Sequence, residues 1–92
     1  MNEPGAQPNV LMYTQALCGY CAAARELLNN KGISYTEIDV TMDADKRRDM
    51  VARSGRKTVP QIFIGERHIG GFDDMASLDS QGELDALLGI DS

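Results

Sequence analysis

Hydrophobic and polar residues follow two different periods along this chain of 92 residues. Residues 10–14 (VLMYT) form a short apolar run, which predicts a buried strand. Apolar residues then recur at helical spacing and predict a helix over residues 22–30 with one apolar face: Tyr20, Ala24, Leu27 and Leu28. Lys31-Gly32 supplies a cation in the last turn and a glycine after it, so we expect the helix to end there.

The middle of the chain repeats this order. Residues 34–40 alternate in polarity as a strand does. Asp43 or Asp45 can cap a second helix that runs to about Ser54, and Gly55 closes it.

A hairpin and two short helices complete the pattern. Strand-like residues 61–64 and 67–69 flank a tight turn at Gly65-Glu66. Residues 73–80 and 83–88 read as helices separated by Gly82. This order predicts an α/β fold with one four-stranded mixed sheet and helices on both faces. The first two strands should be parallel, joined by a right-handed crossover.

The length predicts one small domain, for which we expect residues 9–92. Residues 1–8 are polar and contain Pro4, Gly5 and Pro8, so we expect a flexible N-terminal tail. They lack the basic start and apolar core of a signal peptide, and no apolar stretch approaches transmembrane length.

Charge is unevenly distributed. The net charge of −5 argues against nucleic acid or an anionic membrane as the main partner. Six of the nine basic residues fall between Lys46 and Lys57, whereas the segment from Glu66 onward carries seven acids and one base. The basic cluster is either a solvated helix face or a local field for an anionic ligand.

The candidate chemistry lies in Cys18-Gly19-Tyr20-Cys21, which holds both cysteines of the chain. The pattern places Cys18 in a strand-to-helix turn, near a helix N-terminus. Unpaired N–H groups and the positive end of the helix dipole favour a thiolate there. The thiolate is the nucleophilic form of cysteine, and Cys21 is close enough to form a disulfide with it.

Two other uses of the cysteine pair are open. A structural disulfide across so small a loop would contribute only about 2 kcal/mol by chain entropy. A structural zinc ion needs four ligands, and His68 is the only histidine in the sequence. Redox chemistry in a reducing cytosol is therefore the favoured interpretation. His68 itself is expected to be a surface residue.

Three motifs together resemble the glutaredoxin family, which has a thioredoxin-like fold: Cys18-Gly19-Tyr20-Cys21, Thr58-Val59-Pro60 and Gly70-Gly71-Phe72-Asp73-Asp74. The resemblance covers nearly all of residues 9–88 and is closest to the small dithiol bacterial type. It implies catalytic Cys18 with Cys21 as the resolving thiol. It also implies a cis bond before Pro60 and a glutathione site formed by Tyr20, Lys57, Thr58, Val59, Pro60, Gly71, Phe72, Asp73 and Asp74.

In the pose that the resemblance implies, the γ-glutamyl end of glutathione lies on Asp73-Asp74. Its cysteinyl amide pairs with the Val59 backbone, and its glycyl carboxylate lies near basic residues. From the residues alone, Pro60 could equally be a trans proline that opens a strand, and Asp73-Asp74 could simply cap a helix.

The chain departs from the family pattern at three positions. Gln15 replaces a frequent lysine, for which Lys57 is expected to compensate, and Leu17 replaces a frequent threonine or serine. Gly19 stands where proline is commonest. Because some relatives with glycine or serine there hold a [2Fe–2S] cluster, the resemblance leaves that alternative open. Such a cluster would be ligated by Cys18 of two chains and by two glutathiones.

The expected function is a glutathione-dependent thiol–disulfide oxidoreductase that acts on protein–glutathione mixed disulfides and small disulfides. Glutathione is the reductant, with no resident metal in this interpretation. We expect a cytoplasmic monomer with no nucleic-acid or membrane partner. A general protein-disulfide reductase of the thioredoxin type is less well supported, because the sequence contains no tryptophan to lie beside the cysteines.

Overall fold

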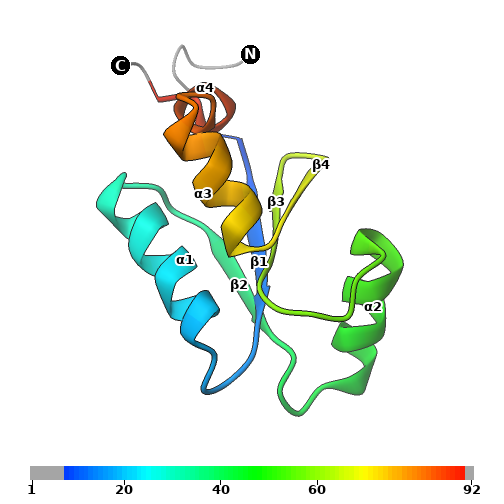
Figure 1. Ribbon diagram of the computed structural model, residues 1–92. Coiled ribbons are helices and arrows are strands. Elements are labelled where there is room, and N and C mark those ends of the chain that lie inside the picture. Colours follow the sequence, from blue (N-terminus) through cyan, green and yellow to red (C-terminus); the bar gives the residue numbers. More distant parts are fainter. Residues whose placement is uncertain (1–7, 91–92) are drawn as a thin grey trace.

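A computed structural model describes residues 8–90 (Figure 1). Its elements alternate as the sequence predicts and are, in order, β1 (Val10–Thr14), α1 (Gly19–Asn30), β2 (Thr36–Asp39), α2 (Ala44–Ser54), β3 (Gln61–Ile64), β4 (Arg67–Gly70), α3 (Phe72–Ser80) and α4 (Leu84–Leu88). Within residues 8–90, no helix has the length and apolar character needed to cross a membrane. Residues 1–7 of the predicted tail lie outside the described residues.

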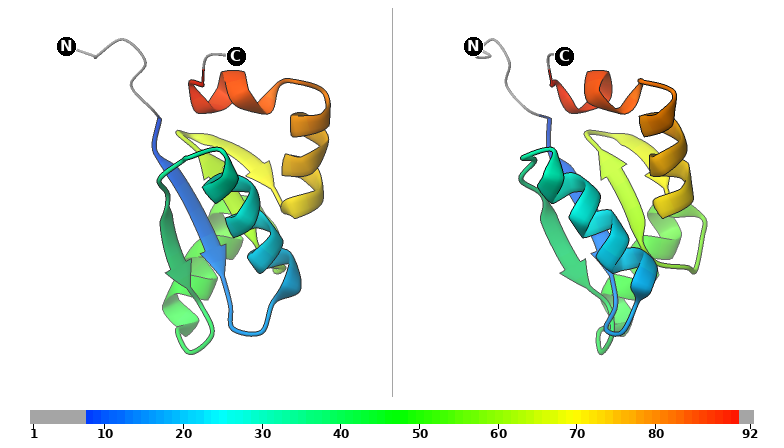
Figure 2. Two further views of the ribbon diagram at one scale, coloured as in Figure 1. Left: turned by 90° about the vertical axis from the view of Figure 1, so that its left-hand side faces the viewer. Right: turned by 60° about the vertical axis from the view of Figure 1, so that its left-hand side comes forward.

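The four strands form one mixed sheet in the order β2-β1-β3-β4. β1 and β2 are parallel, whereas β1 with β3 and β3 with β4 are antiparallel. The prediction of a four-stranded mixed sheet is therefore confirmed. α1 and α3 cover one face of the sheet and α2 covers the other, as the two views of Figure 2 show.

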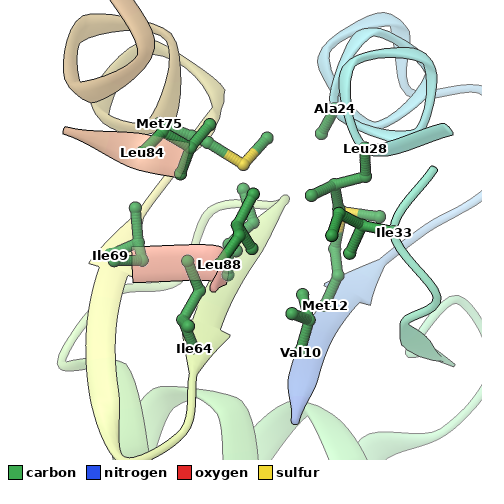
Figure 3. Packing of buried hydrophobic residues seen from close by; sticks show 11 residues of the cluster. Val10, Met12, Ala24, Leu28, Ile33, Ile64, Ile69, Met75, Leu84 and Leu88 are labelled. Carbon is green, nitrogen blue, oxygen red and sulfur yellow. The ribbon is translucent and has the colours of Figure 1, made fainter. Parts of the chain in front are cut away.

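Alternate residues of the central strands supply the two cores. Val10 and Met12 of β1 face α1 and α3, whereas Tyr13 faces α2. The larger core joins six further elements or segments to these residues (Figure 3); its other buried members are Ala24, Leu28, Ile33, Ile62, Ile64, Ile69, Met75, Leu84 and Leu88. The smaller core under α2 contains Tyr13, Val40, Met50 and Phe63.

Two elements differ from their predicted bounds by more than one residue at one end, whereas β4, α3 and α4 differ by a single residue. α1 begins at Gly19 rather than at residue 22, because the Cys18 side chain caps its first turn. β2 covers Thr36–Asp39 rather than 34–40, because its pairing with β1 runs only from Leu11 to Thr14. Of the two predicted N-caps of α2, the structure uses Asp43 and places Asp45 in the first turn, and a left-handed Gly55 ends the helix as predicted.

Candidate active site

Cys18 occupies the N-cap of α1, at the turn that leaves β1. Its Sγ accepts a hydrogen bond from the Cys21 backbone N–H at 3.1 Å. The same sulfur lies 3.9 Å from the Val59 carbonyl oxygen, to which its S–H can donate. Cys18 is half-buried, so the helix N-terminus presents a sulfur that is both hydrogen-bonded and accessible.

Cys21 differs from Cys18 in its burial, because its side chain is fully enclosed beneath the first turn of α1. Burial, and then a hydrogen bond with the Cys18 side chain, raises the pKa of the Cys21 thiol to about 11. Both thiols are free in this structure. The arrangement therefore separates an accessible sulfur from a buried one that stays protonated near neutral pH.

A cavity of about 320 Å³ opens beside these cysteines, between α1, the segment before β3 and the start of α3. It is lined by Tyr20, Arg56, Thr58, Val59, Pro60, Gly71, Phe72, Asp73 and Asp74. The bond between Val59 and Pro60 is cis, as the family resemblance implied. Tyr20 and Phe72 stack at 6.4 Å between ring centroids, so two aromatic rings form one wall.

Charges meet at the far end of this cavity. One carboxylate oxygen of Asp74 accepts the Gly71 N–H at 2.9 Å and pairs with the Arg56 guanidinium at 3.0 Å. The Gly71 N–H and then Arg56 hold the pKa of the Asp74 carboxyl below its usual value. Gly70 has a φ of +118°, and a Cβ there would collide with the Asp74 carboxylate. The glycine is thus required for Asp74 to reach this position.

Comparison with known proteins agrees with this geometry. The family model described as Glutaredoxin matches residues 10–69. Glutaredoxin 3 of Escherichia coli (strain K12) is 52% identical over 80 residues, which cover 87% of this chain and 96% of that protein. The chain belongs to the glutaredoxin family.

Solved glutaredoxins share the fold. The solution structure of glutaredoxin from Brucella melitensis superposes with a TM-score of 0.82 at 47% identity, covering 95% of each chain. The buckwheat glutaredoxin–glutathione complex superposes with a TM-score of 0.80 at 28% identity, covering 88% of this chain and 76% of that one. The thioredoxin-like fold predicted from the three motifs is therefore confirmed.

Eight of the nine residues expected to bind glutathione line the cavity of this glutaredoxin; the exception is Lys57. Lys57 instead lines a separate cleft against α2, together with Arg47 and Val51. Arg56, one residue earlier, is the cation in the cavity wall. The sequence grouped Arg56 with the basic cluster but gave no sign of its pair with Asp74, because eighteen residues separate the two.

A second cation lies beside the loop that carries the cysteines. The Arg47 guanidinium of α2 donates to the Gln15 side-chain oxygen at 2.9 Å. Gln15 replaces the lysine that is frequent in the family, so Arg47 brings positive charge to that position from another element. The sequence did not reveal this contact, since Arg47 lies 32 residues further along the chain.

Proposed function

We propose that this glutaredoxin is a glutathione-dependent oxidoreductase that reduces protein–glutathione mixed disulfides and small disulfides through Cys18. The observation that supports it best is the accessible Cys18 sulfur, which lies 3.9 Å from the Val59 carbonyl oxygen. Val59 lines the cavity, and the charged side chains of the cavity wall lie beyond it. A thiol that is hydrogen-bonded at a helix N-terminus is a competent nucleophile. The cavity then selects which disulfides reach it.

The chemistry of glutathione suits the cavity wall. The γ-glutamyl end carries one ammonium and one carboxylate, and the paired Asp74 and Arg56 offer one group of each opposite charge. N–H groups at the start of α3 add to the attraction for the carboxylate. The cysteinyl amide pairs with the Val59 backbone, as an added strand would. The glycyl carboxylate then points toward the basic segment 46–57.

The proposed reaction begins when the Cys18 thiolate attacks the glutathione sulfur of a mixed disulfide. The bond between that sulfur and the substrate sulfur breaks, and the substrate leaves as a thiolate that takes up a proton. Cys18 is then disulfide-bonded to glutathione. A second glutathione thiolate attacks the glutathione sulfur of this disulfide, which yields oxidised glutathione and regenerates the Cys18 thiolate.

Cys21 offers a second route. Its thiol loses a proton and attacks the Cys18 sulfur, which releases the bound glutathione as a thiolate and leaves a Cys18–Cys21 disulfide. Two glutathione molecules later reduce this disulfide and become oxidised glutathione. Burial raises the pKa of the Cys21 thiol and keeps its thiolate scarce at neutral pH, so the rate of this route should increase with pH.

The test is a glutathione-linked assay on a glutathionylated peptide with Cys18→Ser and Cys21→Ser beside wild type. We expect Cys18→Ser to abolish activity, because it removes the nucleophile. Cys21→Ser should retain deglutathionylation but lose the reduction of protein disulfides that needs a second thiol. Equal loss of peptide deglutathionylation in both variants would contradict the assigned roles.

The iron–sulfur alternative rests on the glycine at position 19. A Cβ built at Gly19 meets no atom within 4 Å, so the structure does not require glycine there. The dithiol mechanism is the proposal because the Cys18 sulfur lies against the first turn of α1, within reach of Cys21. Anaerobic isolation followed by a visible absorption spectrum tests the alternative, since a cluster ligated by Cys18 and glutathione would absorb and would disappear in Cys18→Ser.

The proposed setting is a monomer in the cytoplasm. The proposed cycle consumes glutathione, so it needs a compartment that keeps glutathione reduced. Size-exclusion chromatography under reducing conditions and cell fractionation test these two statements.

A further inference from the structure

Gln61 is a fully buried polar side chain directly after Pro60. Its amide nitrogen donates to the Thr58 carbonyl oxygen at 3.0 Å and to the Thr58 hydroxyl oxygen at 3.2 Å. Its amide oxygen lies 2.7 Å from Nε2 of His68 on β4. A continuous hydrogen-bonded chain therefore joins the single histidine to a residue that lines the active-site cavity.

Which atom donates in each of these hydrogen bonds follows from the Thr58 carbonyl, because that group can only accept. The Thr58 carbonyl has no hydrogen to donate, so the NH₂ of Gln61 must face it. The Gln61 oxygen then faces His68, and Nε2 of His68 must carry a hydrogen. Because the Thr58 hydroxyl oxygen accepts from Gln61, its own hydrogen is free to point into the cavity.

We propose that His68 and Gln61 are positioning residues that orient Thr58 so that its hydroxyl donates a hydrogen bond to the bound glutathionyl group. The inference rests on the proposed function, since it assigns the cavity to glutathione. His68 acts through Gln61 and contacts no substrate. It was expected to be a surface residue, but it is half-buried and packs on Phe63 with 4.9 Å between ring centroids.

The surroundings of His68 keep its ring neutral. Burial lowers the pKa of His68, the nearby Arg56 cation lowers it further, and Asp74 partly opposes them. In the neutral ring only one nitrogen carries hydrogen, and the chain assigns it to Nε2. Loss of that donor leaves the Gln61 oxygen unpaired. The Gln61 side chain then shifts to find another partner for that oxygen, which weakens its hydrogen bonds to the Thr58 carbonyl and hydroxyl oxygens and leaves the hydroxyl without a fixed direction.

The experiment compares His68→Phe with His68→Gln in steady-state kinetics on a glutathionylated peptide at pH 8. Phenylalanine fills the space but cannot donate, whereas glutamine places an N–H near the position of Nε2. We expect His68→Phe to raise KM about fivefold, equivalent to about 1 kcal/mol, with kcat changed less than about twofold. His68→Gln should retain the wild-type KM.

Two measurements that do not depend on glutathione accompany the kinetics. Alkylation of Cys18 by iodoacetamide should proceed at the same rate in wild type and both variants. Long-range ¹H–¹⁵N spectra of wild type should show hydrogen on Nε2 of His68. Hydrogen on Nδ1 alone, or equal KM values for His68→Phe and His68→Gln, would overturn the inference. If wild type fails to turn over the peptide, the proposed function fails, and the spectra still decide the direction of the chain.

Discussion

At the scale of single residues, two thiols three positions apart have different properties because the helix buries only one of them. Cys18 lies at the N-cap, where its sulfur accepts the Cys21 N–H and stays half-exposed. Cys21 lies one turn into the helix and has no exposed surface. Desolvation disfavours the thiolate of Cys21, so its reaction must wait for a proton to leave.

The first prediction concerns the pH dependence of the Cys21 route. With Cys18 glutathionylated and free glutathione removed, release of glutathione requires attack by the Cys21 thiolate. Burial is the largest cause of the raised pKa of Cys21 and persists when Cys18 carries glutathione, so the thiolate stays the minor form and its fraction rises about tenfold for each pH unit. The release rate should therefore increase about tenfold per unit between pH 7 and pH 9. Cys21→Ser is the control, and a plateau by pH 8 would contradict the prediction.

Arg56 and Lys57 are adjacent cations in different clefts, which makes them a matched pair. Arg56→Ala removes the guanidinium that pairs with Asp74 and should raise KM for a glutathionylated peptide about threefold to tenfold. The effect should shrink at high salt, because both side chains are about half exposed. Lys57→Ala should change KM less than about twofold. A larger effect from Lys57→Ala would restore the role that the sequence suggested for it.

At the scale of elements, one carboxylate joins α1 to two strands. Glu37 of β2 accepts two hydrogen bonds at 3.0 Å from Nε of Arg25 on α1 and one at 2.8 Å from Nη2. It also accepts the hydroxyl of the buried Thr14 on β1 at 2.7 Å. Arg25, with a smaller contribution from Thr14, lowers the pKa of Glu37, although burial opposes the shift.

Glu37→Gln should therefore lower the free energy of unfolding at pH 7 by about 0.5–1 kcal/mol, a value limited by partial exposure. A carboxyl whose pKa is lower in the folded state than in the unfolded state stabilises the fold above the unfolded-state pKa. That stabilisation is lost as pH falls through the folded-state pKa. The difference between wild type and Glu37→Gln should consequently shrink from pH 5 to pH 3. Urea denaturation across this range measures it. Glu26→Gln, an exposed change on α1 next to Arg25, is the control and should show no such convergence.

The hydrophobic pattern and the turn residues together predicted every strand and helix: residues 10–13 are an apolar run, residues 34–40 alternate, and β3 and β4 flank the turn at Gly65-Glu66. The two larger errors, at the starts of β2 and α1, have different causes. Thr36 is the first residue of β2 to pair because β1 offers it Leu11, and the start of α1 depends on a cysteine acting as the cap. The first depends on a strand from a distant part of the sequence, and the second on a residue type that is not among the usual helix caps.

The site shows the same division. Motif residues such as Thr58 and Asp74 could be identified from the sequence because they occur in fixed local runs. Arg56 and His68 could not, because their roles arise from partners brought near by the fold, Asp74 and Gln61. Arg56 differs from its basic neighbours only in which cleft its side chain enters.

At the scale of the whole molecule, the cavity is assembled from the N-terminal ends of α1 and α3 and from the segment before β3. Tyr20 and Phe72 meet at those ends, about 15–18 Å from the far end of α1 at 1.5 Å per residue. At that far end, Lys31 Nζ lies 2.8 Å from Asp79 of α3 and 2.6 Å from Asp85 of α4. The largely buried Lys31 ammonium thus links α3 and α4 to the end of α1 through two ion pairs.

Lys31→Met keeps the length of the side chain but removes its charge. The variant therefore tests whether the two ion pairs affect only the free energy of unfolding or also the KM. Both ion pairs are partly buried, and we expect a loss of about 1–2 kcal/mol in the free energy of unfolding. In a domain of this size the melting temperature should fall by about 5–15 °C. Lys31→Arg should retain most of the stability, and the exposed Lys46→Met should change little.

The KM for a glutathionylated peptide should stay within about twofold of wild type in Lys31→Met, measured at least 10 °C below its melting point. The reason is that the Tyr20–Phe72 wall is held by the buried core between α1 and α3, through residues such as Ala24 and Met75, and not by the distant cation. A several-fold rise in KM at that temperature would show that the ion pairs set the alignment of α1 and α3 along their whole length. In that case the charge at Lys31 would be part of what shapes the cavity.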